Sequence, residues 1–280
     1  MQNFLIGMLT AVLIAYLAYR AHALDQSGAF AAGILGTVVF GLGGGGWALV
    51  MLTFFISSSL LSKFFRTRKA VAEGDFAKGS NRDAWQVAAN GGVAGVAALA
   101  FFIFTQFGLA NNLLPLLWVG FAGSLAGANA DTWATELGVL NPREPVLLTT
   151  MHRVPQGTSG GVSLAGTMAA LAGATLVGGI AVWVSWLGWA PVLGVPVWKA
   201  LFAIAVGGLL GSLVDSLLGA TGQAIYYCPA CEKQTEKHPT HTCGTATEHH
   251  RGLPWLNNDW VNFICTFSGG LVAVLLFLLL

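Results

Sequence analysis

The chain has 280 residues, of which 55% are hydrophobic and only 9% are charged, and its mean hydropathy is +0.69. Soluble domains carry about 25% charged residues, so this composition excludes a soluble globular protein and predicts an integral membrane protein. The net charge of +1 gives no indication of a nucleic-acid partner, and none is expected. We interpret residues 1–280 as a single integral membrane domain.

Eight apolar runs are long enough, at about 20 residues each, to cross a bilayer as helices. Met1 to Tyr19 has no small-residue cleavage site, so we interpret it as a retained first helix and not as a signal peptide. Glycines at 43–46 separate the second and third runs as a tight turn or a flexible break. We predict an all-α polytopic transmembrane bundle with about eight spans, within a range of seven to nine. The runs fall near 3–20, 28–43, 46–63, 86–107, 113–138, 161–189, 197–221 and 259–280.

Basic residues gather in alternate loops of this predicted bundle. Of the thirteen Lys and Arg residues, only Lys199 falls on one side. The other twelve lie in or beside the loops near 20–27, 64–85, 139–160 and 222–258. Cytoplasmic loops carry an excess of Lys and Arg, so we predict a protein of the cell inner or plasma membrane with both termini outside and these loops in the cytoplasm. Most polar residues lie near the same loops, whereas the polar site of a transporter usually lies at mid-membrane.

Two carboxylates, Asp131 and Glu136, lie near the end of the run 113–138. A carboxylate in hydrocarbon costs roughly 2.5–3.5 kcal/mol unless it has a partner, and no Lys or Arg lies between Leu113 and Leu140. The pair indicates an external cation, such as a metal ion, a proton or a substrate, the alternative being two ordinary acids at a hydrated helix end. On a straight helix the two acids lie about 140° apart, so either the helix is irregular or they serve different partners.

A second stretch repeats the pattern around Asp131. Both stretches read Gly-x-x-x-Asp-[Ser/Thr], with a glycine seven positions after the aspartate. The matching residues are Gly127, Asp131 and Gly138 in the first stretch and Gly211, Asp215 and Gly222 in the second. One interpretation is an internal repeat that supplies two carboxylates to one divalent metal ion, and the other is chance similarity between glycine-rich helices.

A glycine-rich segment leads into the sixth predicted span. Glycines let backbone N–H groups approach an anion, and a helix N-terminus adds the positive end of its dipole. We predict that this segment binds phosphate and that Arg153 neutralises part of its charge, although no Gly-Lys-[Ser/Thr] of a P-loop is present. The alternative is a flexible loop that enters a closely packed helix. The predicted phosphate-binding residues are Gly157, Thr158, Ser159, Gly160 and Gly161.

Polar residues at the starts of two spans extend this predicted site. Arg82 precedes the fourth span, where it can neutralise a phosphate or, alternatively, belongs to a capped and positively charged helix start. Residues 257–259 open the last span with more polar groups than capping alone explains. The predicted nucleotide- or phosphate-binding residues outside the glycine segment are Asn81, Arg82, Asn90, Asn129 and Arg153, and the further predicted metal ligands are Asn258 and Asp259.

The loop 222–258 is a predicted cytoplasmic insert that holds three of the four cysteines. Cys228-Pro-Ala-Cys231 is followed by His241-Thr-Cys243. Three cysteines and one histidine suit a tetrahedral zinc ion in a structural site, and the alternative is a set of thiols without a metal.

Several of these segments together resemble a known family. They are Gly-Ala-Asn-Ala-Asp-Thr-Trp-Ala-Thr-Glu-Leu-Gly, Pro-x-Gly-Thr-Ser-Gly-Gly-Val-Ser, Gly-Ser-Leu-Val-Asp-Ser-Leu-Leu-Gly-Ala and Trp-Leu-Asn-Asn-Asp. They resemble domain-of-unknown-function family ninety-two, which includes transmembrane protein nineteen and the plant and cyanobacterial phytyl-phosphate kinases. Asp131-x-x-Ala134-x-x-x-Gly138 is also similar to an element of CTP-dependent dolichol and phytol kinases and CDP-diacylglycerol synthases. The copy at Asp215 has Leu218 in place of the alanine and matches that element less closely.

The resemblance implies a kinase that transfers the γ-phosphoryl group of CTP, or of another nucleoside triphosphate, to an isoprenoid monophosphate at the cytoplasmic face. It implies Mg²⁺ held by Asp131 and Asp215, with Glu136 as a further catalytic or metal-binding acid. The acceptor phosphate is already an anion, so no general base is required. The alternatives are a cytidylyltransferase that forms a CDP-lipid, and a transporter or cation permease. The oligomeric state stays open, with a homo-oligomer among the alternatives.

Overall fold

The computed structural model describes residues 2–69 and 81–280, and eight long helices dominate it. Each is long and apolar enough to cross a membrane, α2 together with the π-helix that continues it, which confirms the predicted all-α polytopic bundle. The predicted loop 64–85 falls partly on residues 70–80, outside the described residues. The long helices are α1 (Gln2–Arg20), α2 (Gln26–Val38), α3 (Gly45–Lys69), α4 (Ala84–Phe107), α5 (Leu114–Gly138), α6 (Leu164–Trp186), α7 (Val197–Thr221) and α8 (Asn258–Leu279).

Glycine separates the second and third spans, as the sequence predicts. After α2 the chain continues as a short π-helix, η1 (Val39–Gly43), and Gly44 then has a φ of 91°. This left-handed region of backbone conformation costs glycine little because it has no Cβ. A short 3₁₀ turn, η2 (Asn111–Leu113), leads from α4 into α5.

The sixth helix begins later than the apolar run 161–189 predicts. The first residues of that run form β2 (Gly161–Val162), which pairs antiparallel with β1 (Val146–Leu147). Ser163 then caps α6 by accepting a hydrogen bond from the backbone N–H of Gly166. The glycine segment therefore stands just before a helix N-terminus and is not part of the helix.

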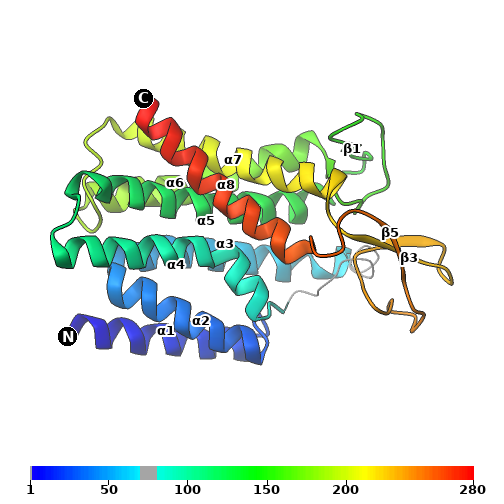
Figure 1. Cartoon of the computed structure of the whole chain (residues 1–280), viewed down its shortest axis with the longest axis horizontal. Coiled ribbons are helices and arrows are strands. Elements are labelled where there is room, and N and C mark those ends of the chain that lie inside the picture. The colour runs from blue at the N-terminus through cyan, green and yellow to red at the C-terminus, as the bar shows by residue number, and fades with distance from the viewer. Residues whose placement is uncertain (1, 70–80) are drawn as a thin grey trace.

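Figure 1 shows both chain termini at one end of the bundle and the short strands at the other end. An even number of spans places both termini on one side, in agreement with the predicted topology. The predicted insert 222–258 contains a three-stranded antiparallel sheet in the order β4-β3-β5. Its strands are β3 (Ile225–Cys228), β4 (Lys233–Thr235) and β5 (Glu248–Arg251).

Helix α5 is the most buried of the eight spans. Its first half packs Trp118 and Phe121 against Trp47 of α3, with ring centroids 4.9 and 4.5 Å from that of Trp47. Outward-facing side chains such as Phe30 and Leu279 are large, apolar and exposed, as the hydrocarbon of a bilayer requires. Aromatic rings thus fill the half of the bundle near the termini, and the polar groups of α5 lie in the half near the strands.

Two glycines of the predicted repeat make the same contact with α8. A Cβ added at Gly127 would lie 3.3 Å from the carbonyl oxygen of Cys265, and one added at Gly211 would lie 2.7 Å from the same atom. Small residues let membrane helices bring their backbones together. Helices α5 and α7 therefore pack on one stretch of α8 through corresponding positions.

The repeat extends one helical turn further back than the sequence pattern suggested. A Cβ added at Gly123 or Gly207 would lie 2.8 Å from the carbonyl oxygen of Gly269. Both helices therefore read Gly-x-x-x-Gly-x-x-x-Asp, ending at Asp131 and Asp215. Residues four apart lie on one helix face, so the same packed face leads to an aspartate in each helix.

Replacing Gly211 with alanine should destabilise the bundle. The added methyl group would meet backbone atoms of α8, which cannot rotate away, and overpacking of this kind costs about 1–3 kcal/mol. We expect a lower midpoint of thermal unfolding in detergent. The matched control is Gly92→Ala in α4, where a Cβ meets nothing within 4 Å and the loss of a helical glycine is stabilising. Equal midpoints for the two variants would contradict the close contact.

Candidate functional site

A polar cavity of about 300 Å³ opens among the strand-side ends of the helices. It is lined by residues of α3 to α8, of the loops 139–163 and 222–257 and of the segment just before α4. Most residues that the sequence singled out contribute to its wall. They are Arg82, Asn90, Asp131, Glu136, Gly157, Thr158, Ser159, Gly160, Gly161, Asp215 and Asn258.

Three carboxylates from three separate segments face one another in this cavity. Asp131 comes from α5, Asp215 from α7 and Glu236 from the loop that follows β4. Each of the two aspartates experiences the negative charge of Glu236, and Asp215 also experiences that of Asp131. Ser212, one turn before Asp215, interacts with the Asp131 carboxylate. Oδ2 of Asp215 is buried and has no hydrogen-bond partner among the described residues.

Glu136 has different partners from Asp131. Helix α5 is continuous through both acids, so they point to different sides of it. The Ser62 hydroxyl donates a hydrogen bond of 2.7 Å to Oε1 of Glu136, and the Glu136 charge acts on Arg82. The helix irregularity that the sequence left open is not observed between the two acids, and their partners within the protein differ.

Arg82 is a partly buried cation on the cavity wall, two residues before the start of α4. Its guanidinium donates hydrogen bonds to the hydroxyls of Ser58 and Ser59, at 2.9 and 3.1 Å. It also lies over the rings of Phe54 and Phe55, 5.6 and 5.7 Å from their centroids. Burial lowers the pKa of Arg82 to about 10, while the charge of Glu136 acts in the opposite direction. Arg82 is therefore still protonated at neutral pH.

The glycine segment forms a tight loop against the end of α7. Gly157 and Gly160 have φ angles of 82° and 83°, and a Cβ at Gly160 would lie 2.3 Å from the backbone nitrogen of Ala220. The predicted hydroxyl donors are engaged within the protein. Thr158 donates to the carbonyl oxygen of Pro155 at 2.7 Å. A bound anion would therefore accept hydrogen bonds from backbone N–H groups and from the N-terminus of α6. The hydroxyls would donate fewer hydrogen bonds to it than the sequence suggested.

Ser159 begins a chain of hydrogen bonds that ends at a carboxylate. Its hydroxyl donates to Oε1 of Gln223 at 2.7 Å, and Nε2 of Gln223 donates to Oε1 of Glu236 at 2.9 Å. Gln223 is almost fully buried. The chain connects the glycine loop to the acidic side of the cavity and holds Glu236 in place.

Four residues of the predicted site are not part of the cavity wall. Asn129 is fully buried and connects three helices, since it accepts a hydrogen bond from Ser57 of α3 and donates one to the carbonyl oxygen of Gly173 in α6. Its carboxamide is a packing element and does not reach the cavity. The other three residues, the exposed Asn81 and Arg153 and the partly exposed Asp259, also lie outside the wall.

Sequence reasoning missed Glu236 and Gln223. Glu236 stands in a charged segment next to Lys237, and nothing in its spacing separates it from Glu232 or Glu248 in the same insert. Only the folding of the insert back over the bundle reveals its place. Asn262, one helical turn into α8, also lines the cavity, and it extends the polar start of the last span that the sequence indicated.

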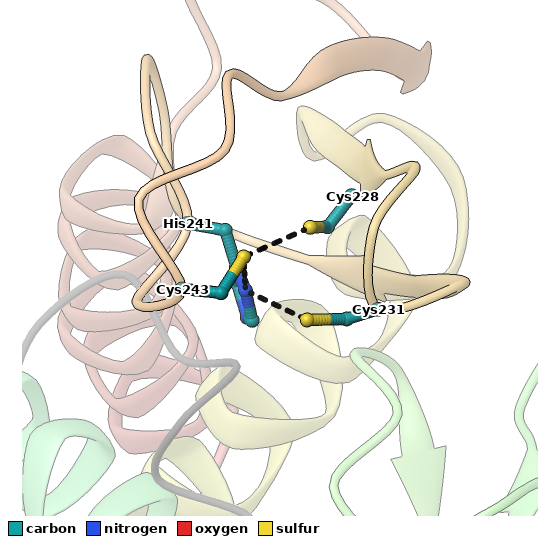
Figure 2. Close-up of side chains that lie close together, drawn as sticks. All are labelled: Cys228, Cys231, His241 and Cys243. Atoms are coloured by element: carbon teal, nitrogen blue, oxygen red, sulfur yellow. Dashed lines mark hydrogen bonds between the residues drawn. The ribbon is translucent and has the colours of Figure 1, made fainter.

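Cys228, Cys231, His241 and Cys243 converge in the insert, as Figure 2 shows. One donor atom from each lies within 4.8 Å of the others, and the sulfurs of Cys228 and Cys243 are 3.5 Å apart. Zinc–sulfur bonds of about 2.3 Å would place two sulfurs about 3.8 Å apart in a tetrahedron. The four side chains therefore fit one zinc ion.

Hydrogen bonds shift the pKa values of two thiols of this cluster in opposite directions. A hydrogen bond with the Thr245 hydroxyl, and a smaller contribution from one with His241, lower the pKa of Cys243 to about 5. A hydrogen bond with Cys243 raises the pKa of Cys231 to about 11. Metal binding requires thiolates, and the hydrogen bonds to Cys243 favour its thiolate form.

The insert is attached directly to the helices that carry the cavity. Arg251 of β5 donates a hydrogen bond to the carbonyl oxygen of Gly219 at the end of α7. Backbone hydrogen bonds join Leu253 to Gly222 and Ala224 to Leu256. The metal-ligand cluster and the carboxylate cavity thus belong to one connected piece of structure.

The chain is similar to membrane proteins of plants and archaea over nearly its whole length. The family described as "Integral membrane protein DUF92" matches residues 9–270. Protein PGR of Arabidopsis thaliana is 34% identical, over 92% of this chain and 90% of its own length. An uncharacterised membrane protein of Methanocaldococcus jannaschii is 27% identical, over 97% of this chain and 93% of its own. Protein VTE6, chloroplastic, of Arabidopsis thaliana is 26% identical, over 90% and 65%. No solved structure matches the chain significantly.

Proposed function

Because this chain belongs to the DUF92 family of integral membrane proteins, we propose that it is a phosphotransferase acting on an isoprenoid monophosphate. The γ-phosphoryl group of CTP, or of another nucleoside triphosphate, would be transferred to the lipid phosphate. The observation that carries the proposal is one cavity that joins a carboxylate cluster, a glycine loop before a helix N-terminus and a partly buried arginine just before α4. The resemblance of the sequence to phytyl-phosphate kinases supports the same chemistry.

The charge of the cavity favours a divalent cation as a partner of the nucleotide. Among the described residues, four carboxylates and one guanidinium line it, so a triphosphate would be repelled unless cations offset that charge. Asp131, Asp215 and Glu236 are the residues that would hold Mg²⁺, a cation that prefers oxygen ligands. The buried oxygen of Asp215 is available to it. When bound, Mg²⁺ supplies neutralisation of charge on the β- and γ-phosphates.

The other residues of the cavity would bind the two substrates at separate positions. The loop 157–161 and the N-terminus of α6 would bind phosphate oxygens of the nucleotide through backbone N–H groups. Arg82 would hold the phosphate of the lipid, because it is a fixed cation where the spans end. Phosphoryl transfer depends mainly on positioning and charge neutralisation, and the acceptor is already an anion. These residues meet that requirement without a general base.

The distribution of basic residues supports a cytoplasmic position of the cavity. It opens at the end of the bundle that carries the predicted cytoplasmic loops. Nucleoside triphosphates are present in that compartment, and the lipid phosphate would come from the inner leaflet. The aromatic rings that fill the other half of the bundle count against a transport pathway along its axis.

Purified protein should be incubated with Mg²⁺, labelled CTP or ATP, and phytyl or geranylgeranyl monophosphate. We expect the lipid diphosphate and a nucleoside diphosphate. Pyrophosphate and a CDP-lipid would instead identify a cytidylyltransferase. Intact nucleotide with every acceptor would contradict the proposed function, and accumulation of a solute in proteoliposomes without nucleotide would identify a transporter.

The insert is proposed to carry a structural zinc ion on its three cysteines and His241. We expect about one zinc per chain by elemental analysis and a lower thermal midpoint after chelation, because structural zinc contributes directly to folding. Cys231→Ser should lose the metal. Cys265→Ala, which removes a buried thiol in α8, should retain it. Zinc-free protein of unchanged stability would refute the site.

A further inference from the structure

A second, apolar cavity of about 80 Å³ lies among α1, α2, α3 and α4. Its wall is almost entirely hydrocarbon. Small side chains leave this space open, namely Ala11, Ala15 and Ala18 on α1 and Ala32 on α2. Ala11 and Ala18 are seven residues apart, or about 10 Å along a helix. The cavity thus runs along about two turns of helix, from the strand-side end of α1 toward the middle of the bundle.

The apolar cavity adjoins the polar one at three residues. Arg82, Gln86 and Asn90 line both. Arg82 stands just before α4, and Gln86 and Asn90 follow on the first turns of that helix. A molecule with a polar head and an apolar tail could therefore occupy both cavities at once, with its head beside Arg82.

Arg82 gives this junction a fixed positive charge. The hydroxyls of Ser58 and Ser59 hold its guanidinium from one side. The rings of Phe54 and Phe55, which also line the apolar cavity, lie beneath it. Guanidinium groups bind phosphate oxygens strongly. The charge, the polarity and the shape of the junction all match an amphiphile with an anionic head.

We propose that the apolar cavity binds the hydrocarbon chain of the lipid acceptor while Arg82 binds its phosphate. This rests on the proposed phosphotransferase function and adds a determinant of substrate choice. A cavity of about 80 Å³ has room for the first carbon atoms of one chain and not for two chains side by side, so the proposed occupant is a single-chain prenyl phosphate and not a diacyl lipid. The chain enters between α1 and α2 on one side and α3 and α4 on the other, and chain length is selected by the alanine-lined space.

Narrowing the apolar cavity should change which lipid chains the protein accepts without changing nucleotide binding. Ala32→Leu adds three carbon atoms inside the cavity, and Ala31→Leu adds the same atoms at the neighbouring position, which is outside its wall. We expect Ala32→Leu to raise KM for geranylgeranyl monophosphate by about tenfold or more, the range that small changes in apolar pockets produce. KM for the nucleotide should stay the same, and geranyl monophosphate should be affected less. Equal behaviour of the two variants would overturn the proposal.

Photolabelling tests the binding site independently of turnover. A prenyl monophosphate with a diazirine at the end of its chain, used without nucleotide, should label residues of α1 to α4 that face the cavity. Unlabelled prenyl monophosphate should compete, and prenyl alcohol should compete at least tenfold less well. Labelling of other helices, or equal competition by the alcohol or by a diacyl phospholipid, would overturn the proposal. Correct labelling with no phosphoryl transfer would refute the proposed function while leaving this binding site intact.

Discussion

Replacing Asp131 with asparagine is expected to reduce phosphoryl transfer by at least about 10²-fold, the effect of losing one preorganised electrostatic group, while the bundle stays folded. The substitution keeps the size and the hydrogen-bonding capacity of the side chain. It removes a negative charge that acts on Asp215. Because like charges in a cavity repel, the variant without added metal should unfold at the same temperature as the wild type or at a higher one.

Magnesium provides a second readout for this variant. A ligand that binds only the folded state raises stability by RT ln(1 + [L]/Kd), so Mg²⁺ with nucleotide should raise the thermal midpoint of the wild type. This shift should be lost in Asp131→Asn. The control is Asp83→Asn, since Asp83 is the N-cap of α4 outside the cavity and asparagine caps equally well. Normal turnover of Asp131→Asn would remove Asp131 from the site.

Replacing Glu236 with glutamine should weaken Mg²⁺ binding in the cavity without disturbing the cysteine cluster. The amide keeps a hydrogen-bond acceptor for Gln223 but removes the third carboxylate of the cavity. We expect turnover to fall by about 10–100-fold, the usual cost of losing a group that supports a metal site. The Mg²⁺ concentration for half-maximal activity should rise, which is measured by titration at saturating nucleotide.

Two controls complete this test: the zinc content of the variant, and the substitution of another carboxylate in the same insert. Glu236→Gln should keep the same zinc content as the wild type, because Glu236 is not among the four ligands. Glu248→Gln removes an exposed carboxylate from β5 of the same insert and should leave the Mg²⁺ titration unchanged. If both variants shifted the titration equally, the effect would come from the net charge of the insert and not from Glu236.

The spans and the two aspartates could be predicted because a membrane makes their signals strong. Hydrocarbon requires long apolar helices, and a carboxylate within them is costly, so Asp131 and Asp215 stood out by residue type alone. Their matching glycines also indicated helices with similar neighbours, although the earlier pair, Gly123 and Gly207, became visible only through their contacts with Gly269.

The rest of the site depends on tertiary contacts that carry no local pattern. Glu236 lies in a hydrophilic loop where an acid is unremarkable by composition, and its role follows from the docking of that loop on α7. Asn129 has the residue type expected of a binding site, yet its carboxamide connects three helices. Residue type predicts that a buried amide needs partners, but it does not tell whether they are a ligand or another helix.

The glycine contacts of α5 and α7 with α8 also restrict how the molecule can move. Helices that touch through their backbones cannot slide past each other without driving side chains into main-chain atoms. The distance between the backbones that carry Asp131 and Asp215 is therefore set by the packing of α5 and α7 on α8. We therefore expect the loops 139–163 and 222–257, and not the helices, to move when substrates enter the polar cavity. Solvent viscosity and loop substitutions should then influence the turnover rate more than substitutions on the lipid-facing helix surfaces.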